Sequence, residues 1–489
     1  MAPPLLAPRA QAWLRVLAAA ALVPAAALLT AAAPLIACSS EATSEPTGEP
    51  SRPAVTPPVT TPPGDPPPAG TAPSPPPSGP ALTTVRVHYA GKPGALSLRG
   101  AKAPLSWDVS APLALAPGER AVYTWSSATI TDDLELKPML GETWSRGPNY
   151  RVKPGKTIDI YPHFVETQGS YSKRYPAFVS QKLPSTRGVW VYLPPTYLEN
   201  TEARFGVVYM QDGQNLFDAA TAFGGNEWKV DETLDAAAED GSIREVVVVG
   251  IENTGGRIDE LTPTVDATYG GGKANQYLSM IIDELKPKID AELRTIPTRE
   301  QTAVMGSSLG GLFSAYVGVH RSDVFGLVGA MSPSTWWDNT FILGDVATMA
   351  GKPVRPLRVY VDSGDAGNSN DGVANTTLLA GKYRSAGYTD GKDFKHVVQA
   401  GGQHNEIYWA QRLPAALAFV VGPRDALWDT PPPARRGPER DAGAAPSTTR
   451  RRRRGAAAGR GCACRRRAPP DRARTRRSRP RARRRRARG

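Results

Sequence analysis

The sequence predicts an α/β fold, in which a sheet carries helices on both faces, preceded by a small all-β sandwich. Three observations support this prediction. Residues 305–311 place a glycine–serine–glycine pattern between an apolar strand and an apolar helix. About 250 residues surround that pattern, which is enough for a sheet covered on both sides. Before them, residues 82–164 contain short runs that alternate in polarity and are separated by turns, as in a sandwich.

The pattern Gly306-x-Ser308-x-Gly310 fits the nucleophile elbow of serine hydrolases of the α/β type. A nucleophilic serine must stand clear of the sheet, so the backbone turns sharply from strand into helix. Small residues on both sides of the serine let neighbouring chain pass close by. Thr302–Met305 is the predicted strand and Leu309–Val319 the predicted helix. The expected core is therefore an α/β-hydrolase sheet with Ser308 as its nucleophile.

Three histidines follow Ser308 in the chain, and the fold requires its histidine after the acid. His320 lies about three turns along the predicted helix, away from the serine. His396 lies in the predicted strand 393–398. His404 lies in the loop just after that strand, where a general base is expected. We therefore predict that His404 takes the proton of Ser308.

Three aspartates compete for the acid position between the serine and the histidine. All lie in or after the predicted strand 357–362: Asp365 is the first choice, Asp371 the second and Asp362 the third. The acid should fix the tautomer of the imidazole and stabilise the imidazolium. At least two of the three are expected only to accept hydrogen bonds from turn amides, as aspartates in Gly/Ser/Asn-rich loops do.

A tetrahedral intermediate needs two N–H donors for its oxyanion. One is predicted to be the backbone amide of Leu309, next after the nucleophile. The other is predicted to be the amide of Gln214, in the loop after the predicted strand 206–211. The tryptophans nearby either line the substrate or pack at the sheet edge; they are Trp228, Trp336 and Trp337.

Several further motifs follow one another in this region. They are 189–197 (VWVYLPPTY), 209–217 (YMQDGQNLF), 247–257, 306–311 (GSSLGG), 332–337 (SPSTWW) and 404–406 (HNE). Over roughly residues 170–422 they resemble the putative esterase family, which includes enterochelin-esterase-like and esterase-D-like proteins. The resemblance implies an α/β-hydrolase core acting on carboxylic esters, with family substrates that include siderophore, feruloyl and acetyl-polysaccharide esters and thioesters. The acid position varies in such families, so the resemblance does not fix Asp365.

Residues 82–165 form the predicted sandwich domain. It resembles the immunoglobulin-like or starch-binding-like domains that often precede such esterases. Its tryptophans either bind sugar or pack in the core and between domains; they are Trp107, Trp125 and Trp144. The hydrolase domain is expected to span 170–425.

The first 38 residues have the composition of an export signal, with Arg9 and Arg15 before an Ala/Leu-rich run. Residues 35–38 (LIAC) resemble a bacterial lipobox, in which Cys38 is lipidated; the alternative is an ordinary signal peptide cut nearby. Residues 39–81 are rich in Pro, Thr and Ser and are expected to form a linker. We expect an exported protein anchored by lipid in the bacterial cell envelope, at the outer membrane or surface, or alternatively secreted.

The tail 434–489 accounts for the basic net charge. It holds 23 arginines and three acids, a net of +20, whereas the whole chain is +13, so the remainder is −7. Arginine clusters can bind nucleic acid, but the tail has no aromatic interleaving, and we interpret it as a frameshift product or, alternatively, as a disordered basic tail. No nucleic-acid partner is expected. Two of the three cysteines lie in this tail, and the third is Cys38 in the predicted lipobox. The folded part therefore has no cysteine that could form a thiolate metal site.

The sequence therefore predicts an exported serine esterase without cofactor or metal, acting on a small-molecule or polysaccharide-linked ester. One alternative is an acyltransferase that uses the same triad, which would depend on an acceptor alcohol. A second alternative is a non-catalytic surface lipoprotein that binds carbohydrate, in which Ser308 would not react with a fluorophosphonate.

Overall fold

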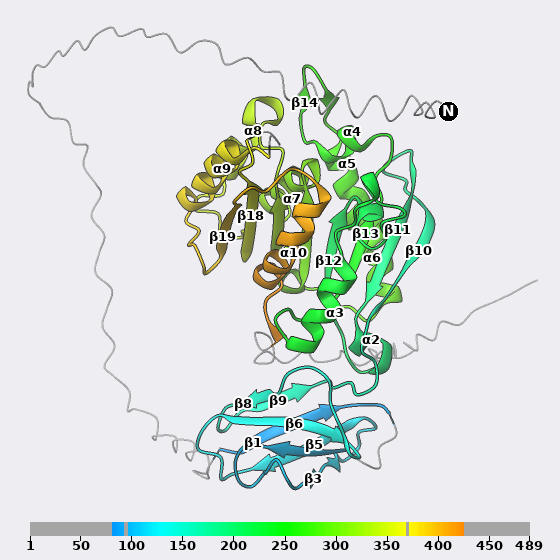
Figure 1. Ribbon diagram of the computed structural model, residues 1–489, viewed down its shortest axis with the longest axis vertical. Helices are drawn as coiled ribbons and strands as arrows, with labels where there is room; N and C mark the ends of the chain where they lie inside the picture. The colour runs from blue at the N-terminus through cyan, green and yellow to red at the C-terminus, as the bar shows by residue number, and fades with distance from the viewer. Residues whose placement is uncertain (1–80, 92–95, 368–370, 425–489) are drawn as a thin grey trace, which may run out of the picture. The chain divides into compact units, whose positions relative to one another are not determined.

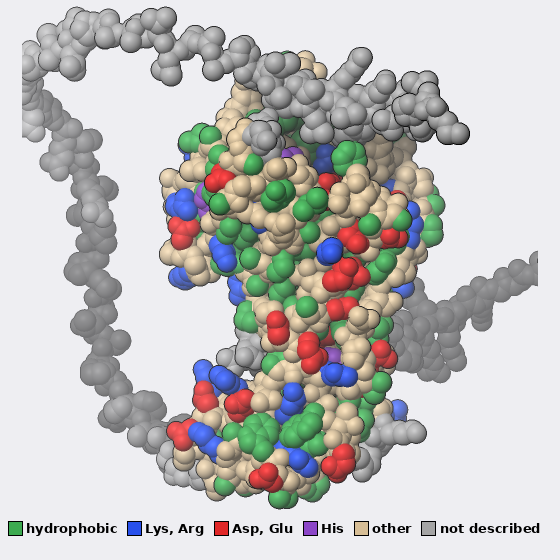
Figure 2. Space-filling model, in the orientation of Figure 1, with side chains coloured by type: hydrophobic (Ala, Val, Ile, Leu, Met, Phe, Trp, Pro, Cys, Tyr) green, Lys and Arg blue, Asp and Glu red, His purple; other side chains and the backbone are tan. Residues whose placement is uncertain are grey.

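The structure is a computed structural model that describes residues 81–91, 96–367 and 371–424. The predicted export signal with Cys38, the linker up to residue 80 and the tail 434–489 lie outside the described residues. Within the described part, no helix combines the length and the apolar composition needed to cross a bilayer. On the face shown in Figure 2, acidic, basic and hydrophobic side chains are interspersed.

The N-terminal region forms the expected all-β unit, made of two sheets. One has the strand order β4-β5-β1-β9 and the other β3-β2-β6-β7, with β8 also paired to β6 (Figure 1). Alternate residues of β1, such as Val85 and Val87, are fully buried and meet Leu98 and Leu134 of the other sheet. The strands are β1 (Thr83–His88), β2 (Leu96–Gly100), β3 (Ala111–Pro112), β4 (Ala114–Leu115), β5 (Val122–Ser127), β6 (Leu134–Leu140), β7 (Thr143–Trp144), β8 (Tyr150–Val152) and β9 (Thr157–Ile160).

The following region is built on one sheet of eight strands, in the order β10-β11-β13-β12-β16-β17-β18-β19. β11 is antiparallel to both of its neighbours, and the pairs from β13 to β19 are all parallel. The strands are β10 (Ser170–Val179), β11 (Thr186–Leu193), β12 (Gly206–Gln211), β13 (Val246–Ile251), β16 (Thr302–Ser307), β17 (Leu327–Met331), β18 (Arg358–Gly364) and β19 (Phe394–Gln399). The predicted α/β-hydrolase sheet is confirmed.

Helices cover both faces of this sheet, which is why its central strands are apolar throughout. In β12, Val208 and Met210 pack with α3 and α10, whereas Val207 and Tyr209 pack with the helices of the opposite face. The helices are α2 (Pro195–Glu199), α3 (Val230–Asp240), α4 (Arg257–Leu261), α5 (Ala274–Ser279), α6 (Lys286–Glu292), α7 (Leu309–His320), α8 (Trp337–Ala347), α9 (Val373–Ser385) and α10 (Glu406–Val420). A π-helical segment, Met280–Leu285, joins α5 to α6. A two-stranded hairpin, β14 (Val265–Asp266) and β15 (Gly270–Gly271), precedes α5.

The strand order brings two loops together at the carboxyl edge of the sheet. The chain leaves β12 through α3 to reach β13 on one side, and then returns through α5 and α6 to β16 on the other side of β12. The connections from β12 and β16 thus depart toward opposite faces. Open α/β sheets bind ligands where the strand order reverses in this way. The loop 212–215 and Ser308 both lie there.

Gly306 offers a test of the steric argument for the elbow. A Cβ at this position would meet the side-chain oxygen of Gln211 and the backbone of Gly310, whereas a Cβ on Gly344 in α8 would meet nothing within 4 Å. We expect Gly306→Ala to lower the free energy of unfolding by about 1–3 kcal/mol, as overpacking does. Gly344→Ala should be neutral or should stabilise by up to about 1 kcal/mol. Chemical denaturation of both variants measures this, and equal stabilities would contradict the argument.

Candidate active site

Ser308 lies between β16 and α7 in a backbone conformation that side chains rarely adopt. Its φ is 57° and its ψ is −120°. Strained residues of this kind cost about 1–3 kcal/mol and persist where the surroundings hold them. Here the amide of Ser308 donates to Met331 O (3.1 Å), and its carbonyl accepts from the amide of Ser334 (2.9 Å). These contacts fix the turn that raises the serine above the sheet edge.

The hydroxyl of Ser308 has one hydrogen-bond partner among the described residues. Its Oγ lies 3.4 Å from the Oγ of Ser334, in the segment that follows β17. Ser334 therefore holds the backbone carbonyl of Ser308 with its amide and contacts the side chain of Ser308 with its hydroxyl.

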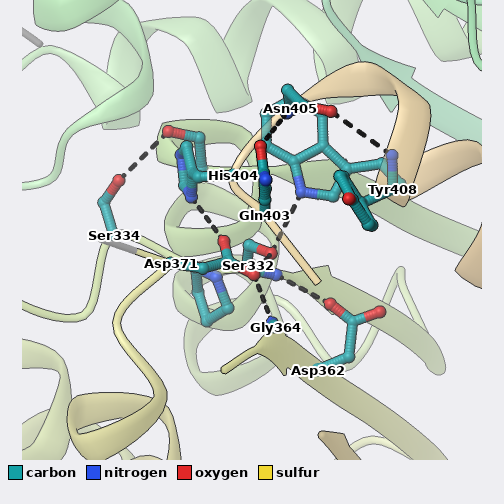
Figure 3. A network of polar contacts seen from close by, with 12 residues as sticks. Ser332, Ser334, Asp362, Gly364, Asp371, Gln403, His404, Asn405 and Tyr408 are labelled. Carbon is teal, nitrogen blue, oxygen red and sulfur yellow. Dashed lines mark hydrogen bonds and ion pairs between the residues drawn. The ribbon is translucent and has the colours of Figure 1, made fainter. Parts of the chain in front are cut away.

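His404 lies in the loop between β19 and α10, as expected. Its Nδ1 is 2.6 Å from Oδ1 of Asp371, and its ring forms a T-shaped contact with Trp409, with centroids 5.1 Å apart. Figure 3 shows Asp371 and His404 facing each other, with Ser332 and Ser334 close by. An acceptor at Nδ1 keeps the ring proton there, so Nε2 is left as the basic nitrogen. Within the described part of the chain, Nε2 has no hydrogen-bond partner.

The aspartate beside His404 is Asp371, the second choice, and the preference for Asp365 was wrong. Asp365 is exposed, and its Oδ1 accepts a hydrogen bond from Gly401 N at 2.6 Å. Asp362 lies beneath the site, where its Oδ1 accepts from Ser332 N at 2.9 Å. The carboxylates of Asp365 and Asp362 therefore both accept hydrogen bonds from backbone amides. Asp371, several residues beyond the end of β18, is the one whose carboxylate comes under the imidazole.

The carboxylate of Asp371 is fully buried, and its second oxygen is held by several donors. Oδ2 accepts from Ser332 Oγ at 3.0 Å and from the amide of Gly364. The guanidinium of Arg412 lies 3.5 Å from the same oxygen. Oδ1 is thereby left to face His404. Sequence reasoning did not identify Ser332, Ser334 or Arg412, although the first two lie in the noted motif 332–337.

The two predicted oxyanion donors lie at the ends of neighbouring strands, β12 and β16. Gln214 lies in a short 3₁₀ turn (Gly213–Asn215), and Leu309 opens α7. Neither backbone amide has an acceptor among the described residues. Gly213 makes the approach possible, because a Cβ there would meet the backbone of Gly250 in β13.

An ion pair holds the loop that carries Gln214. Asp212, which has φ 56°, accepts from Nε and Nη2 of Arg257, both at 2.7 Å, and from the side-chain amide of Asn253 at 2.6 Å. Burial opposes ionisation of Asp212, but Arg257 and Asn253 outweigh it and hold the pKa of this carboxyl below its ordinary value. The backbone N–H of Asn253 donates to Oε1 of Gln214 at 3.2 Å. The pairing joins two of the noted motifs, and sequence alone did not indicate it.

The three tryptophans do not form one aromatic wall. Trp228 and Trp337 are each 1% exposed and belong to the core, so the substrate-lining hypothesis was wrong for them; Trp228 packs against Trp409, behind His404. Trp336 is 38% exposed and packs edge-on against Tyr269. It follows Ser334 by two residues, so it remains a candidate for contact with substrate. In the described part of the chain, no cluster of three or more His, Cys, Asp or Glu side chains could hold a metal ion.

Glu406 adds a further buried acid, at the start of α10. Asn215 Nδ2 donates to its Oε1 at 3.3 Å. Burial raises the pKa of Glu406 to about 7, and the carboxylate of Asp212 adds to this shift, against the opposing effects of a backbone hydrogen bond and of Arg257. The carboxyl therefore changes its charge near neutral pH beside the loop that carries Gln214.

Comparison with known proteins matches residues 180–420 to the family described as Putative esterase. The uncharacterized protein YbbA of Bacillus subtilis is 26% identical over 256 residues, which cover 50% of this chain and 96% of YbbA. The iron(III) salmochelin esterase of Escherichia coli is 30% identical over 185 residues, 37% of this chain and 40% of that protein. An endo-1,4-beta-xylanase/feruloyl esterase of Xylanibacter ruminicola is 26% identical over 192 residues, 37% of this chain and 24% of that protein.

Among solved structures, the BES protein of Bacillus cereus aligns with 53% of this chain and 96% of its own, at a TM-score of 0.41 and 18% identity. A ferulic acid esterase aligns with 52% of this chain and 98% of its own, at a TM-score of 0.42 and 21% identity. The resemblance found in the sequence motifs is confirmed by the family match.

The raised pKa of Glu406 predicts a pH-dependent stability. Between the ordinary value of 4.5 and about 7, the unfolded carboxyl loses its proton while the folded one keeps it, so the folded state loses stability as pH rises through this window. We expect Glu406→Gln to unfold with a higher free energy than the parent at pH 8, by up to about 3 kcal/mol, and with an equal one at pH 4. Denaturant unfolding at both pH values measures this. The exposed Glu142→Gln is the control; a Glu406→Gln effect independent of pH would contradict the assignment.

Proposed function

We propose that this carboxylic ester hydrolase, whose residues 180–420 belong to the putative esterase family, uses Ser308, His404 and Asp371 as its catalytic triad. The observation that carries the proposal is the 2.6 Å contact between His404 Nδ1 and the buried carboxylate of Asp371. The segment 332–334 connects this pair to the nucleophile, because Ser332 contacts Asp371 and Ser334 contacts Ser308. The carboxylate of Asp371, the imidazole of His404 and the hydroxyl of Ser308 thus lie at one edge of the sheet.

In the proposed reaction, the Oγ of Ser308 leaves Ser334 and attacks the carbonyl carbon of the ester, while Nε2 of His404 takes its proton. Catalytic hydrogen bonds are often long before substrate binds, so the contact of Ser308 with Ser334 is compatible with this step. The negative oxygen of the tetrahedral intermediate accepts from the amides of Leu309 and Gln214. Asp371 stabilises the imidazolium that forms.

The intermediate then collapses to an acyl-enzyme on Ser308, and His404 returns the proton to the departing alcohol. Water enters, His404 takes one of its protons, and the resulting hydroxide attacks the acyl carbon. Collapse of the second intermediate breaks the bond to Ser308 Oγ and releases the carboxylic acid, while His404 returns its proton to that oxygen. The free amides of Leu309 and Gln214 serve both intermediates, and losing one such donor typically costs about 100- to 1,000-fold in rate.

We propose that the substrate is an ester of the siderophore, feruloyl or acetyl-polysaccharide type. The names of the related salmochelin and feruloyl esterases support the first two classes. The exposed ring of Trp336, two residues after Ser334, supports a contact with an acyl or sugar group. A panel of p-nitrophenyl, feruloyl and acetyl-xylan esters ranks these classes. A product that forms only with an added acceptor alcohol would indicate transfer instead.

The triad predicts a specific pattern of losses in the variants. Ser308→Ala and His404→Ala should each lower turnover by about 10⁴- to 10⁶-fold, with little further loss in the double variant, because the residues act as a unit. Asp371→Asn should cost about 10⁴-fold, whereas its matched control Asp365→Asn, which alters only a turn contact, should stay within about threefold of the parent. Turnover of p-nitrophenyl esters and labelling by a fluorophosphonate measure this. Multiplying effects of Ser308 and His404, or a larger loss at Asp365 than at Asp371, would refute the triad.

We further propose that the chain is exported and anchored by lipid on Cys38 in the bacterial cell envelope. The charged start, the apolar run and the residues 35–38 support this. When the full chain is made in bacteria fed a labelled fatty acid, we expect the label to be incorporated and to disappear in Cys38→Ala. The control Cys462→Ser/Cys464→Ser, which changes the remaining cysteines, should keep the label. Equal labelling of Cys38→Ala would rule the anchor out.

A further inference from the structure

The hydroxyl of Ser332 has only one direction in which it can donate. Its Oγ receives hydrogen bonds from Trp409 Nε1 (3.0 Å) and from Arg412 Nη2 (2.6 Å). An indole N–H and a guanidinium can only donate, so both lone-pair regions of the oxygen are occupied. The single hydrogen of Ser332 must therefore go to its third neighbour, Oδ2 of Asp371, at 3.0 Å. This hydrogen bond orients the carboxylate of Asp371, whose other oxygen faces His404.

The guanidinium of Arg412 lies between two buried carboxylates. Its Nη2 is 3.5 Å from Asp371 Oδ2, and its Nε is 3.0 Å from Asp362 Oδ2. The side chain of Arg412 is 3% exposed and both carboxylates are fully buried. The Nε contact is out of line for a hydrogen bond, and among the described residues neither Nε nor Asp362 Oδ2 has another hydrogen-bond partner. The pair is therefore held by charge, and Asp362 keeps the cation in place from beneath.

The charged and titratable groups around this cluster come from several elements. β18 contributes Asp362 and Tyr360, and burial together with the Asp362 carboxylate holds the pKa of Tyr360 above its ordinary value. Burial raises the pKa of Asp362 to about 6, against the opposing effect of Arg412. β19 contributes only the neutral Gln399, whose Oε1 accepts from Arg412 Nη1 at 2.8 Å. The loop before α9 contributes Asp371, which faces His404.

We propose that Arg412 is a positioning residue, held by Asp362, that orients Asp371 through Ser332 and sets how readily His404 accepts a proton. This inference rests on the proposed triad and goes beyond it. Neither Arg412 nor Asp362 touches the reacting atoms. Their charges act on the imidazole in opposite senses: the guanidinium disfavours the imidazolium, and the second carboxylate favours it.

Because Arg412 and Asp362 carry opposite charges, removing one or the other should displace the acid limb of the pH profile of kcat/KM in opposite directions. In the full chain, Arg412→Met removes the cation, so we expect the acid limb to move up by about one pH unit. We also expect kcat to fall by about 10- to 100-fold, because Asp371 loses its fixed orientation, with KM within about twofold. Asp362→Asn keeps the shape and removes an anion, so its acid limb should move down. Arg412→Lys keeps the charge and should restore the limb of the parent, with an intermediate kcat.

A control variant separates this role from a general effect of losing an arginine that contacts α10; the control residue is half-buried. Arg358, at the start of β18, contacts the far end of α10 through Phe419 O at 3.3 Å. Arg358→Gln should leave the acid limb and kcat unchanged. An unchanged profile in folded Arg412→Met, or displacement of Arg412→Met and Asp362→Asn in the same direction, would overturn the proposal. If Arg412→Met does not fold, Asp362→Asn and Arg412→Lys decide, because an unmoved or raised limb in Asp362→Asn overturns it.

A readout without substrate distinguishes failure of this inference from failure of the proposed function. The chain has five histidines, so ¹⁵N NMR of histidine-labelled full chain can follow His404, assigned with His404→Gln. We expect its titration midpoint to move up in Arg412→Met and down in Asp362→Asn. If the parent shows neither turnover nor fluorophosphonate labelling but the midpoints move as expected, the proposed function fails and the inference stands. If turnover is normal but the midpoints do not move, the proposed function stands and this inference fails.

Discussion

The buried carboxylate of Asp371 is the interaction on which the rest of the site depends. A carboxylate without water is costly unless hydrogen bonds or an opposite charge replace the lost hydration. Three parts of the fold supply that replacement: Ser332 after β17, Gly364 at the end of β18, and Arg412 in α10. The carboxylate of Asp371 is therefore held toward His404 only when these strands and this helix are assembled together.

The segment after β17 joins the acid side of the site to the nucleophile. Ser332 (φ 38°) and Ser308 (φ 57°) are both non-glycine residues in left-handed backbone conformations. Such conformations are retained where neighbouring contacts compensate for their cost. The amides of Ser308 and Ser332 donate to Met331 O and Asp362 O, at 3.1 and 3.0 Å. The strand ends of the parallel sheet thus hold both strained residues. The side chain of Ser308 meets Ser334, and the side chain of Ser332 meets Asp371.

The opposite side of the site uses the same physical device. Asp212 is a buried carboxylate in a left-handed conformation, and Arg257 binds it through two hydrogen bonds. Bidentate pairs of this kind are geometrically demanding, because the planar guanidinium fits a carboxylate in one orientation. Two Asp–Arg contacts therefore hold Asp371 and the loop that carries Gln214, one on each side of Ser308. Within the described residues, His404 Nε2 and the backbone amides of Leu309 and Gln214 are left without hydrogen-bond partners, and these are the atoms that the proposed reaction uses.

The sequence by itself determined the local features of this protein: the strand–Ser308–helix turn, the strand before the Gln214 loop and the position of His404 after β19. These features follow from apolar periodicity and from glycines at positions where two backbone segments approach closely. Both signals can be recognised over a few residues. The tertiary structure decided which aspartate meets His404, that Trp228 and Trp337 are core residues, and that Arg412 and Arg257 complete the site. The physical reason is that these contacts join residues 33 to 45 positions apart in the chain, and longer separations join Ser332 to Arg412. The order of the strands, which no local pattern encodes, brings them together.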